Sequence, residues 1–291
     1  MAEKIETNKD FYKDFFQQES NFLWTQKKQQ EKYMLSDNDI IEIQSKLPDK
    51  KYYEFAYHMF NQRQFTDLDK VWKNWKPWAV WNYPVYDLYR FNTIIIQNKK
   101  FIKNKRVVDL GCNLGYFSLF SLHCGAKFVK GIDVRDKKLP IAEFICKEAG
   151  YDNVDFEKVD FSITTGMHKA LEDIETIICS GIIYHIQNHH QFFKNMTQSS
   201  ASCIIIDNFE DNKYVGELYP HMHWKYENTA GVVNEMGAHD ENNKKMLVGR
   251  PNQTWIDNTM NDLGWSRKKI EYYAPWLDDV SNTRVCSVFT R

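Results

Sequence analysis

The chain has 291 residues, of which 43% are hydrophobic and 15% aromatic, and its formal net charge is −1. This length and composition can bury one substantial core with an additional segment. The near-neutral charge excludes a global basic field, so nucleic-acid binding would depend on a local patch. The first residues are charged, and no apolar run approaches the roughly 20 residues that span a bilayer. We therefore expect a soluble, cytoplasmic protein without membrane segments.

Cysteine usage agrees with a reducing environment. None of the six cysteines forms a C-x-x-C pair, and most fall in segments expected to be core strands or helices. We interpret them as reduced core thiols, not as a disulfide framework or a zinc site.

The first part of the chain differs from the rest. Residues 1–75 contain no convincing strand, and Ser36 to Ile43 combine a helix N-cap signal with helical apolar spacing. We expect a helical N-terminal extension, followed by a second domain over 76–291. The aromatic residues crowded between Trp72 and Phe91 favour a packing collar over a base-stacking platform.

From Arg106 onward, apolar strand patterns alternate with helical ones at the spacing of βαβ units, which predicts a doubly wound, mostly parallel α/β sheet with right-handed crossovers. The expected strands are 106–110, 128–133, 154–160, 175–180, 202–207, 268–274 and 284–290, and the expected helices are 115–124, 139–149, 165–172, 188–198 and 253–263. The stretch 208–251 is too long for a simple connection and is expected to be a flexible substrate arm or lid.

The turn after the first strand carries the sharpest motif. It has an acid, Asp109, followed by Gly111, Asn113 and Gly115, and then a helix whose N-terminal amides can face a ligand. A dinucleotide fingerprint requires three glycines at G-x-G-x-x-G spacing, and this segment fails that pattern twice. Asparagine tolerates a left-handed backbone conformation better than most residues, so Asn113 can occupy the middle position of this glycine turn.

Two further acids follow at the ends of the next strands. Asp133 ends the second strand, where a carboxylate can accept both hydroxyls of a ribose, and Asp160 with Phe161 ends the third, which suits an adenine amino group and ring. Each acid alone would be better explained as a cap or a solvated turn, but the ordered set favours a nucleotide cofactor.

Together these residues resemble the class I S-adenosyl-L-methionine (SAM) methyltransferases, which implies a Rossmann-like seven-stranded sheet with an antiparallel last strand. The resemblance implies that Asp109 faces the methionine ammonium of SAM. It implies that the cofactor lies against Asp109, Gly111, Asn113, Gly115, Asp133, Asp160 and Phe161.

The end of the fourth strand adds Ser180, Tyr184 and His185, which a doubly wound sheet would place beside the cofactor. The segment Gly-Ile-Ile-Tyr-His resembles the motif after the fourth strand in a narrower group of enzymes. These enzymes carboxymethylate the wobble uridine of tRNA with carboxy-S-adenosyl-L-methionine. That resemblance implies that Tyr184 borders the reactive group and that Arg284 binds the extra carboxylate. It also makes Arg90 a cofactor contact in place of a lysine, although the geometry of an arginine differs.

His185 is the first candidate for a general base, and an equally good explanation is a histidine that hydrogen-bonds a neighbouring loop. Asp207 and Glu210, after the fifth strand, are the next candidates. His189 and His190 are expected on the solvated surface.

The arm contains His221, His223, Glu235 and His239, but their spacing matches no strong metal template, so no metal site is expected. Near its end, Asn252 has the position of a helix N-cap and Arg250 that of an anion contact.

The sequence thus favours a SAM-dependent methyltransferase acting by in-line displacement on an unidentified small-molecule or tRNA acceptor. The alternatives are carboxymethyl transfer to tRNA and a non-catalytic SAM-binding regulatory subunit, and a NAD-dependent enzyme ranks well below them. The sequence leaves open whether the protein is a homo-oligomer.

Overall fold

The computed structural model describes residue 90 and residues 93–113, 115–135, 138–148, 150–161, 164–211, 218–228, 245–273 and 282–291. The chain divides into two compact units, residues 1–92 and 93–291. The expected helical extension over 1–75 and most of the aromatic segment Trp72 to Phe91 lie outside the described residues.

The second unit is built on a seven-stranded sheet of order β3-β2-β1-β4-β5-β9-β8. Strands β1 to β5 pair in parallel, and β9 runs antiparallel to both β5 and β8. The strands are β1 Arg106–Leu110, β2 Phe128–Asp133, β3 Val154–Lys158, β4 Thr176–Ser180, β5 Cys203–Asp211, β8 Ser266–Tyr273 and β9 Asn282–Thr290. This confirms the doubly wound α/β sheet and its antiparallel last strand.

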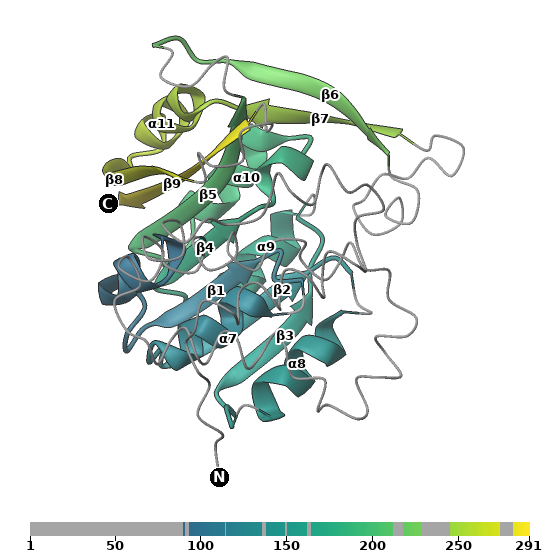
Figure 1. Cartoon of the computed structure of the whole chain (residues 1–291), viewed down its shortest axis with the longest axis vertical. Coiled ribbons are helices and arrows are strands. Elements are labelled where there is room, and N and C mark those ends of the chain that lie inside the picture. The colour runs from purple at the N-terminus through teal and green to yellow at the C-terminus, as the bar shows by residue number, and fades with distance from the viewer. Residues whose placement is uncertain are drawn as a thin grey trace, which may run out of the picture. The chain divides into compact units, whose positions relative to one another are not determined.

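The helices follow the strands in the expected order (Figure 1). They are α7 Tyr116–His123, α8 Leu139–Glu148, α9 Thr164–Ala170, α10 His189–Thr197 and α11 Gln253–Asp262, with 3-10 turns η2 Ile96–Phe101 and η3 Ile183–His185. Among these, α7 packs against α8, while α9, α10 and α11 form a second contiguous group.

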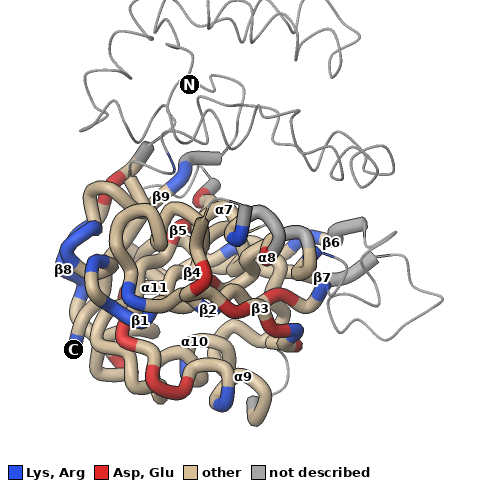
Figure 2. Tube along the Cα trace, turned by 90° about the horizontal axis from the view of Figure 1, so that it is seen from below, with Lys and Arg blue, Asp and Glu red and all other residues tan. Residues whose placement is uncertain are grey.

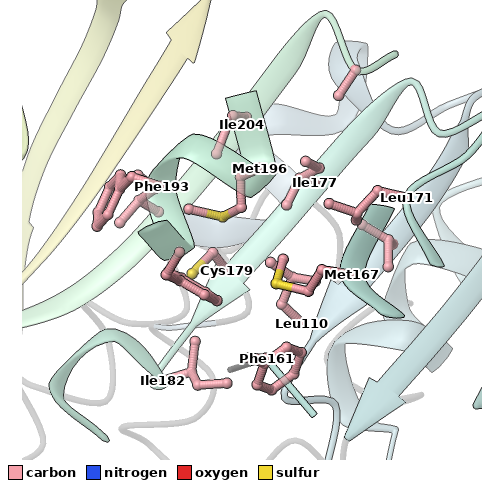
Figure 3. Packing of buried hydrophobic residues seen from close by; sticks show 14 of the residues in the cluster. Leu110, Phe161, Met167, Leu171, Ile177, Cys179, Ile182, Phe193, Met196 and Ile204 are labelled. Carbon is pink, nitrogen blue, oxygen red and sulfur yellow. The ribbon is translucent and has the colours of Figure 1, made fainter. Parts of the chain in front are cut away.

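The core between the sheet and the second helix group is formed by alternate strand residues, as the pleat of a β-strand requires. Ile177 and Cys179 of β4 pack against Met167 of α9 and against Phe193 and Met196 of α10 (Figure 3). All are fully buried. The apolar runs of β1, β4 and β5 are therefore explained by burial on both faces of a parallel sheet.

Most strand boundaries lie within two residues of the sequence-based expectation, and the largest difference is the end of β5. β3 ends at Lys158, which pairs with Asp133, the last residue of β2, and the Val159 N–H donates to the Asp133 carbonyl at 3.1 Å. β5 continues to Asp211, because its pairing with β9 extends as far as Asn282.

The region 208–251 contains a β-hairpin that the sequence analysis did not identify. β6 Met222–Asn228 pairs antiparallel with β7 Lys245–Pro251, and the ribbon forms a separate two-stranded sheet (Figure 1). Strand β7 lies against η3 and β5. The expectation of a flexible arm is thus wrong for these two strands, which pair with one another and contact the main sheet.

All six cysteines are buried and unpaired with one another, which confirms that they are core thiols. Burial raises the pKa of Cys146 to about 12, so its thiol stays protonated and unreactive at neutral pH. No helix in the described part of the chain has the length and apolar character that crossing a bilayer requires.

Candidate cofactor and acceptor site

The turn between β1 and α7 is built from three left-handed residues. Gly111, Asn113 and Gly115 have φ values of 68°, 54° and 76°. The N–H groups of Gly111 and Cys112 both donate to the Ile132 carbonyl, at 2.8 and 3.0 Å, which ties the turn to the end of β2. The prediction that Asn113 accepts a left-handed conformation is therefore confirmed.

Asp109 and Asp133 come from neighbouring parallel strands, and both are buried. Asp109 accepts a hydrogen bond from the Ser118 hydroxyl of α7 at 2.7 Å. Asp133 accepts from the Asn113 N–H at 2.9 Å, so the second acid also supports the turn. Because β1, β2 and β3 are adjacent and parallel, their carboxyl ends lie at the same edge of the sheet. Asp109 and Asp133 are in the last two residues of β1 and β2, and the half-buried Asp160 follows β3 by two residues.

Two basic residues that the sequence analysis missed line this edge. The Arg135 guanidinium donates to both oxygens of Asp133 at 2.9 Å, and Lys138 donates to the Asn113 side chain at 2.7 Å. Burial alone would raise the pKa of Asp133, but the hydrogen bonds and charge of Arg135 outweigh it and hold that pKa below its usual value. A ribose bound at Asp133 would share or replace the Arg135 contacts.

Phe161 belongs to the hydrophobic core beside β4 (Figure 3). Its ring centroid lies 6.0 Å from that of Phe192 in an edge-to-face arrangement. The contact of this ring with an adenine stays a prediction.

On the other side of β1, the end of β4 meets β5 in a buried polar cluster. Ser180 pairs with Asp207 in the sheet, and its hydroxyl donates to the Asp207 carboxylate at 2.6 Å. Arg284 of β9 donates to both Asp207 oxygens, one of them at 3.0 Å. The side chains of Arg284 and Asp207 are only 2% and 0% exposed.

This cluster changes the interpretation of two predicted site residues. Asp207 is paired with Arg284 and has no exposed surface, which argues against its role as a general base. Arg284 already binds a carboxylate of its own chain, so it does not need that of a modified cofactor. Glu210, the other candidate base on β5, accepts the Gln253 N–H at 2.9 Å at the start of α11 and is also buried.

Tyr184 and His185 lie in η3, directly after β4, and both are half-buried. Their ring centroids are 4.4 Å apart, and the Tyr184 ring is 5.1 Å from that of Phe209 on β5. The guanidinium of Arg250 on β7 lies 5.7 Å from the Tyr184 ring. The structure therefore brings the predicted Tyr184 and Arg250 together and adds Phe209, which no sequence motif indicated.

His189 contradicts its expected surface position, whereas His190 is exposed as expected. The His189 Nε2 lies 3.0 Å from the carbonyls of both Ile183 and Gly249. Burial lowers the pKa of His189, although its backbone hydrogen bonds oppose this shift, so the ring is neutral at physiological pH. The Nε2–H of the neutral ring then donates to one carbonyl in η3 and one in β7, which links these two elements.

Other predicted residues have simpler outcomes. Asn252 is confirmed as the N-cap of α11, because its side chain accepts the Trp255 N–H at 3.0 Å. Arg90 is buried in the first unit, and its contact with a cofactor stays a prediction. No metal-binding group of His, Cys, Asp and Glu occurs among the described residues, while Glu235 and His239 lie outside them.

The sheet order, the glycine turn and the acids at adjacent strand ends define the Rossmann-like fold of class I methyltransferases. A family model described as a methyltransferase domain matches residues 102–262, and this chain belongs to that family.

Individual relatives match over shorter stretches. The chain is 31% identical over 124 residues to the ubiquinone biosynthesis O-methyltransferase of Burkholderia thailandensis, which covers 43% of this chain and 50% of the relative. It is 37% identical over 62 residues to protein arginine N-methyltransferase 1 of Dictyostelium discoideum, covering 21% of this chain and 18% of that protein. The chain thus spans at most about half the length of these relatives.

Among solved structures, magnesium protoporphyrin IX methyltransferase from Synechocystis PCC 6803 with bound SAH superposes with a TM-score of 0.52 at 14% identity. The match covers 84% of this chain and all of that one. At this identity the likeness shows the shared fold.

Proposed function

We propose that this protein binds SAM at the carboxyl edge of β1, β2 and β3 and catalyses transfer of its methyl group to a small-molecule acceptor held near Tyr184 and His185. The proposal depends on one observation above all: the left-handed turn at Gly111 to Gly115 is joined by the Asn113 N–H to the side chain of Asp133, the acid at the end of the next strand.

The residues present fit this cofactor. Asp109 supplies a buried carboxylate for an ammonium group, and Asp133 supplies two oxygens for ribose hydroxyls. The turn itself requires glycine at position 111, because its φ is 68° and a Cβ there would lie 2.7 Å from the Ile182 side chain. Bound SAM supplies an activated methyl group for in-line displacement.

The contribution of the protein to such a transfer is mainly positional. Holding an acceptor atom in line with the methyl group can lower the activation barrier by on the order of 7–11 kcal/mol. The rings of Tyr184 and Phe209 provide apolar surface that orients the acceptor and excludes water. His185, half-buried beside Tyr184, is the residue that we propose as the general base for acceptors that must lose a proton.

SAM is favoured over its carboxylated form because Arg284 already makes a two-point salt bridge with Asp207. We propose a small molecule as the acceptor: acidic and basic residues are interspersed over most of the described chain (Figure 2), with basic residues gathered in two short runs, Lys99 to Arg106 and Arg267 to Lys269 on β8. The oligomeric state stays a prediction.

The proposal is tested by calorimetric titration of SAH, SAM and carboxy-SAM into the wild type, Asp133→Ala and Asp155→Ala. Asp155 is the matched control, because it is an exposed acid on the adjacent strand β3. We expect micromolar SAH binding that falls at least tenfold in Asp133→Ala and is unchanged in Asp155→Ala.

Failure of the wild type to bind SAH or SAM would refute the cofactor assignment. A clear preference for carboxy-SAM would instead support carboxymethyl transfer and make tRNA the acceptor to examine next.

A further inference from the structure

The carboxylate of Asp133 already accepts hydrogen bonds at both oxygens. Its Oδ1 accepts from the backbone N–H and from the Nε of Arg135, both at 2.9 Å. Its Oδ2 accepts from the Asn113 N–H and from the Nη2 of Arg135, again at 2.9 Å. A carboxylate offers about four lone-pair sites. A further donor can therefore bind this carboxylate only by replacing a donor that is already there.

The donors to Asp133 are of two kinds. The N–H groups of Asn113 and Arg135 belong to the backbone, and the turn that contains Asn113 is tied to β2 through the Ile132 carbonyl. The guanidinium of Arg135, in contrast, is the end of a long side chain that is 25% exposed, whereas the Asp133 side chain is 2% exposed. The guanidinium can turn out into solvent without any movement of the backbone, so its two bonds are the ones that a ligand can replace.

The geometry of these two bonds matches that of a ribose. The Arg135 guanidinium places one N–H on each oxygen of Asp133, as a bidentate pair does. The neighbouring hydroxyls of a ribose also present two adjacent donors to an acid at the end of the second strand. The guanidinium and the two hydroxyls therefore require the same two lone-pair sites of Asp133.

We propose that the Arg135 guanidinium occupies the carboxylate positions that the ribose hydroxyls of SAM take, so that the cofactor binds by exchange with this guanidinium. This inference rests on the proposed function, since it concerns how the same site takes its cofactor. The two backbone N–H bonds stay in place during the exchange and keep the carboxylate oriented. Arg135 thus lowers the affinity for the cofactor, because two charge-assisted hydrogen bonds must break before the hydroxyls can bind.

The test is calorimetric titration of SAH into the wild type, Arg135→Ala and Arg135→Lys in mildly alkaline buffer, which keeps Asp133 ionised. We expect Arg135→Ala to bind SAH about tenfold more tightly than the wild type, which corresponds to roughly one charge-assisted hydrogen bond. Arg135→Lys should lie between the two, because lysine keeps the charge but not the planar fork.

Two controls separate exchange from a general effect of charge. Lys130→Ala removes a cation of β2 whose ammonium lies 3.8 Å from Glu157, and it should keep the wild-type affinity for SAH. The double variant Asp133→Ala with Arg135→Ala should bind SAH no more tightly than Asp133→Ala alone, because the competition acts through that carboxylate.

Equal or weaker SAH binding in Arg135→Ala would overturn the exchange, and weaker binding would make Arg135 a direct cofactor contact. The exchange is also refuted by an equal gain in Lys130→Ala, or by a gain that persists without Asp133. If neither the wild type nor any variant binds SAH, the proposed function itself fails. Wild-type binding without a gain in Arg135→Ala refutes only the exchange.

Discussion

Asp207 and Arg284, which the sequence indicates as functional residues, form a buried ion pair with each other. Neither side chain has appreciable exposure, and Ser180 donates to the same carboxylate. A buried ionised group is stable only when it is paired with an opposite charge and its remaining polar atoms are hydrogen-bonded. Removing one member of the pair therefore leaves an uncompensated buried charge. The pair therefore constrains the junction of β4, β5 and β9 beside Tyr184.

We predict that Asp207→Leu lowers the free energy of unfolding by about 3–5 kcal/mol, because Arg284 loses its carboxylate. The double variant Asp207→Leu with Arg284→Met should recover a large part of that loss, since neither charge then remains buried. Denaturant unfolding followed by circular dichroism measures both. A single variant as stable as the wild type, or a double variant no better than the single, would contradict this account.

At the scale of elements, the β6–β7 hairpin gains its position from polar contacts with α10, with β5 and with the start of α11. His189, Asn208 and Asn252 bind, respectively, the carbonyls of Gly249, Pro251 and Tyr219. A two-stranded hairpin alone is marginally stable in water. These contacts explain how a short ribbon can present Arg250 to η3.

We predict that Gly249→Ala displaces β7 from α10, because the new methyl group would meet the fixed His189 ring at 2.8 Å. The expected cost is about 1–3 kcal/mol in stability, with faster amide hydrogen exchange confined to β6, β7 and η3. Leu247→Ala on the same strand is the control. Its side chain is 40% exposed, so its stability should change by less than about 0.5 kcal/mol. Unchanged exchange in Gly249→Ala would mean that the close approach has no structural consequence.

For the whole molecule, the cofactor edge joins three strands and two loops that fold as one sheet. Asp133 connects β2 to the turn after β1 through Asn113, and the Asp133 carbonyl accepts the Val159 N–H after β3. A ligand that binds this edge only in the folded state must stabilise the entire sheet by mass action.

We predict that SAH at a hundred times its Kd adds about 2.7 kcal/mol of stability. For a unit of this size that raises Tm by roughly 5–10 °C, as measured by differential scanning fluorimetry. A tenfold weaker site would give about half of this stabilisation at the same SAH concentration, so Asp133→Ala should show at most about half of the shift, and Asp155→Ala should show the full one. A wild-type Tm that does not respond to SAH would contradict binding at this edge.

Local sequence patterns determined the alternation of strands and helices from Arg106 onward and the order of Asp109, Asp133 and Asp160 along the chain. They also determined the left-handed Asn113 and the Asn252 cap. Each of these features depends on neighbouring residues or on the rule that parallel strands end at one edge, so periodicity and spacing suffice to find them.

Tertiary structure alone decided which side chains share the site. Asp207 meets Arg284 across 77 positions, and His189 meets Gly249 across 60. The hairpin was missed although β6 alternates Met222, Trp224 and Tyr226 with polar residues, because β7 carries the apolar run Met246 to Val248 and has no such alternation. Sequence patterns report which face and which end of an element a residue occupies. Lateral pairings such as β5 with β9, which bring Arg284 to Asp207, arise only when the sheet is assembled.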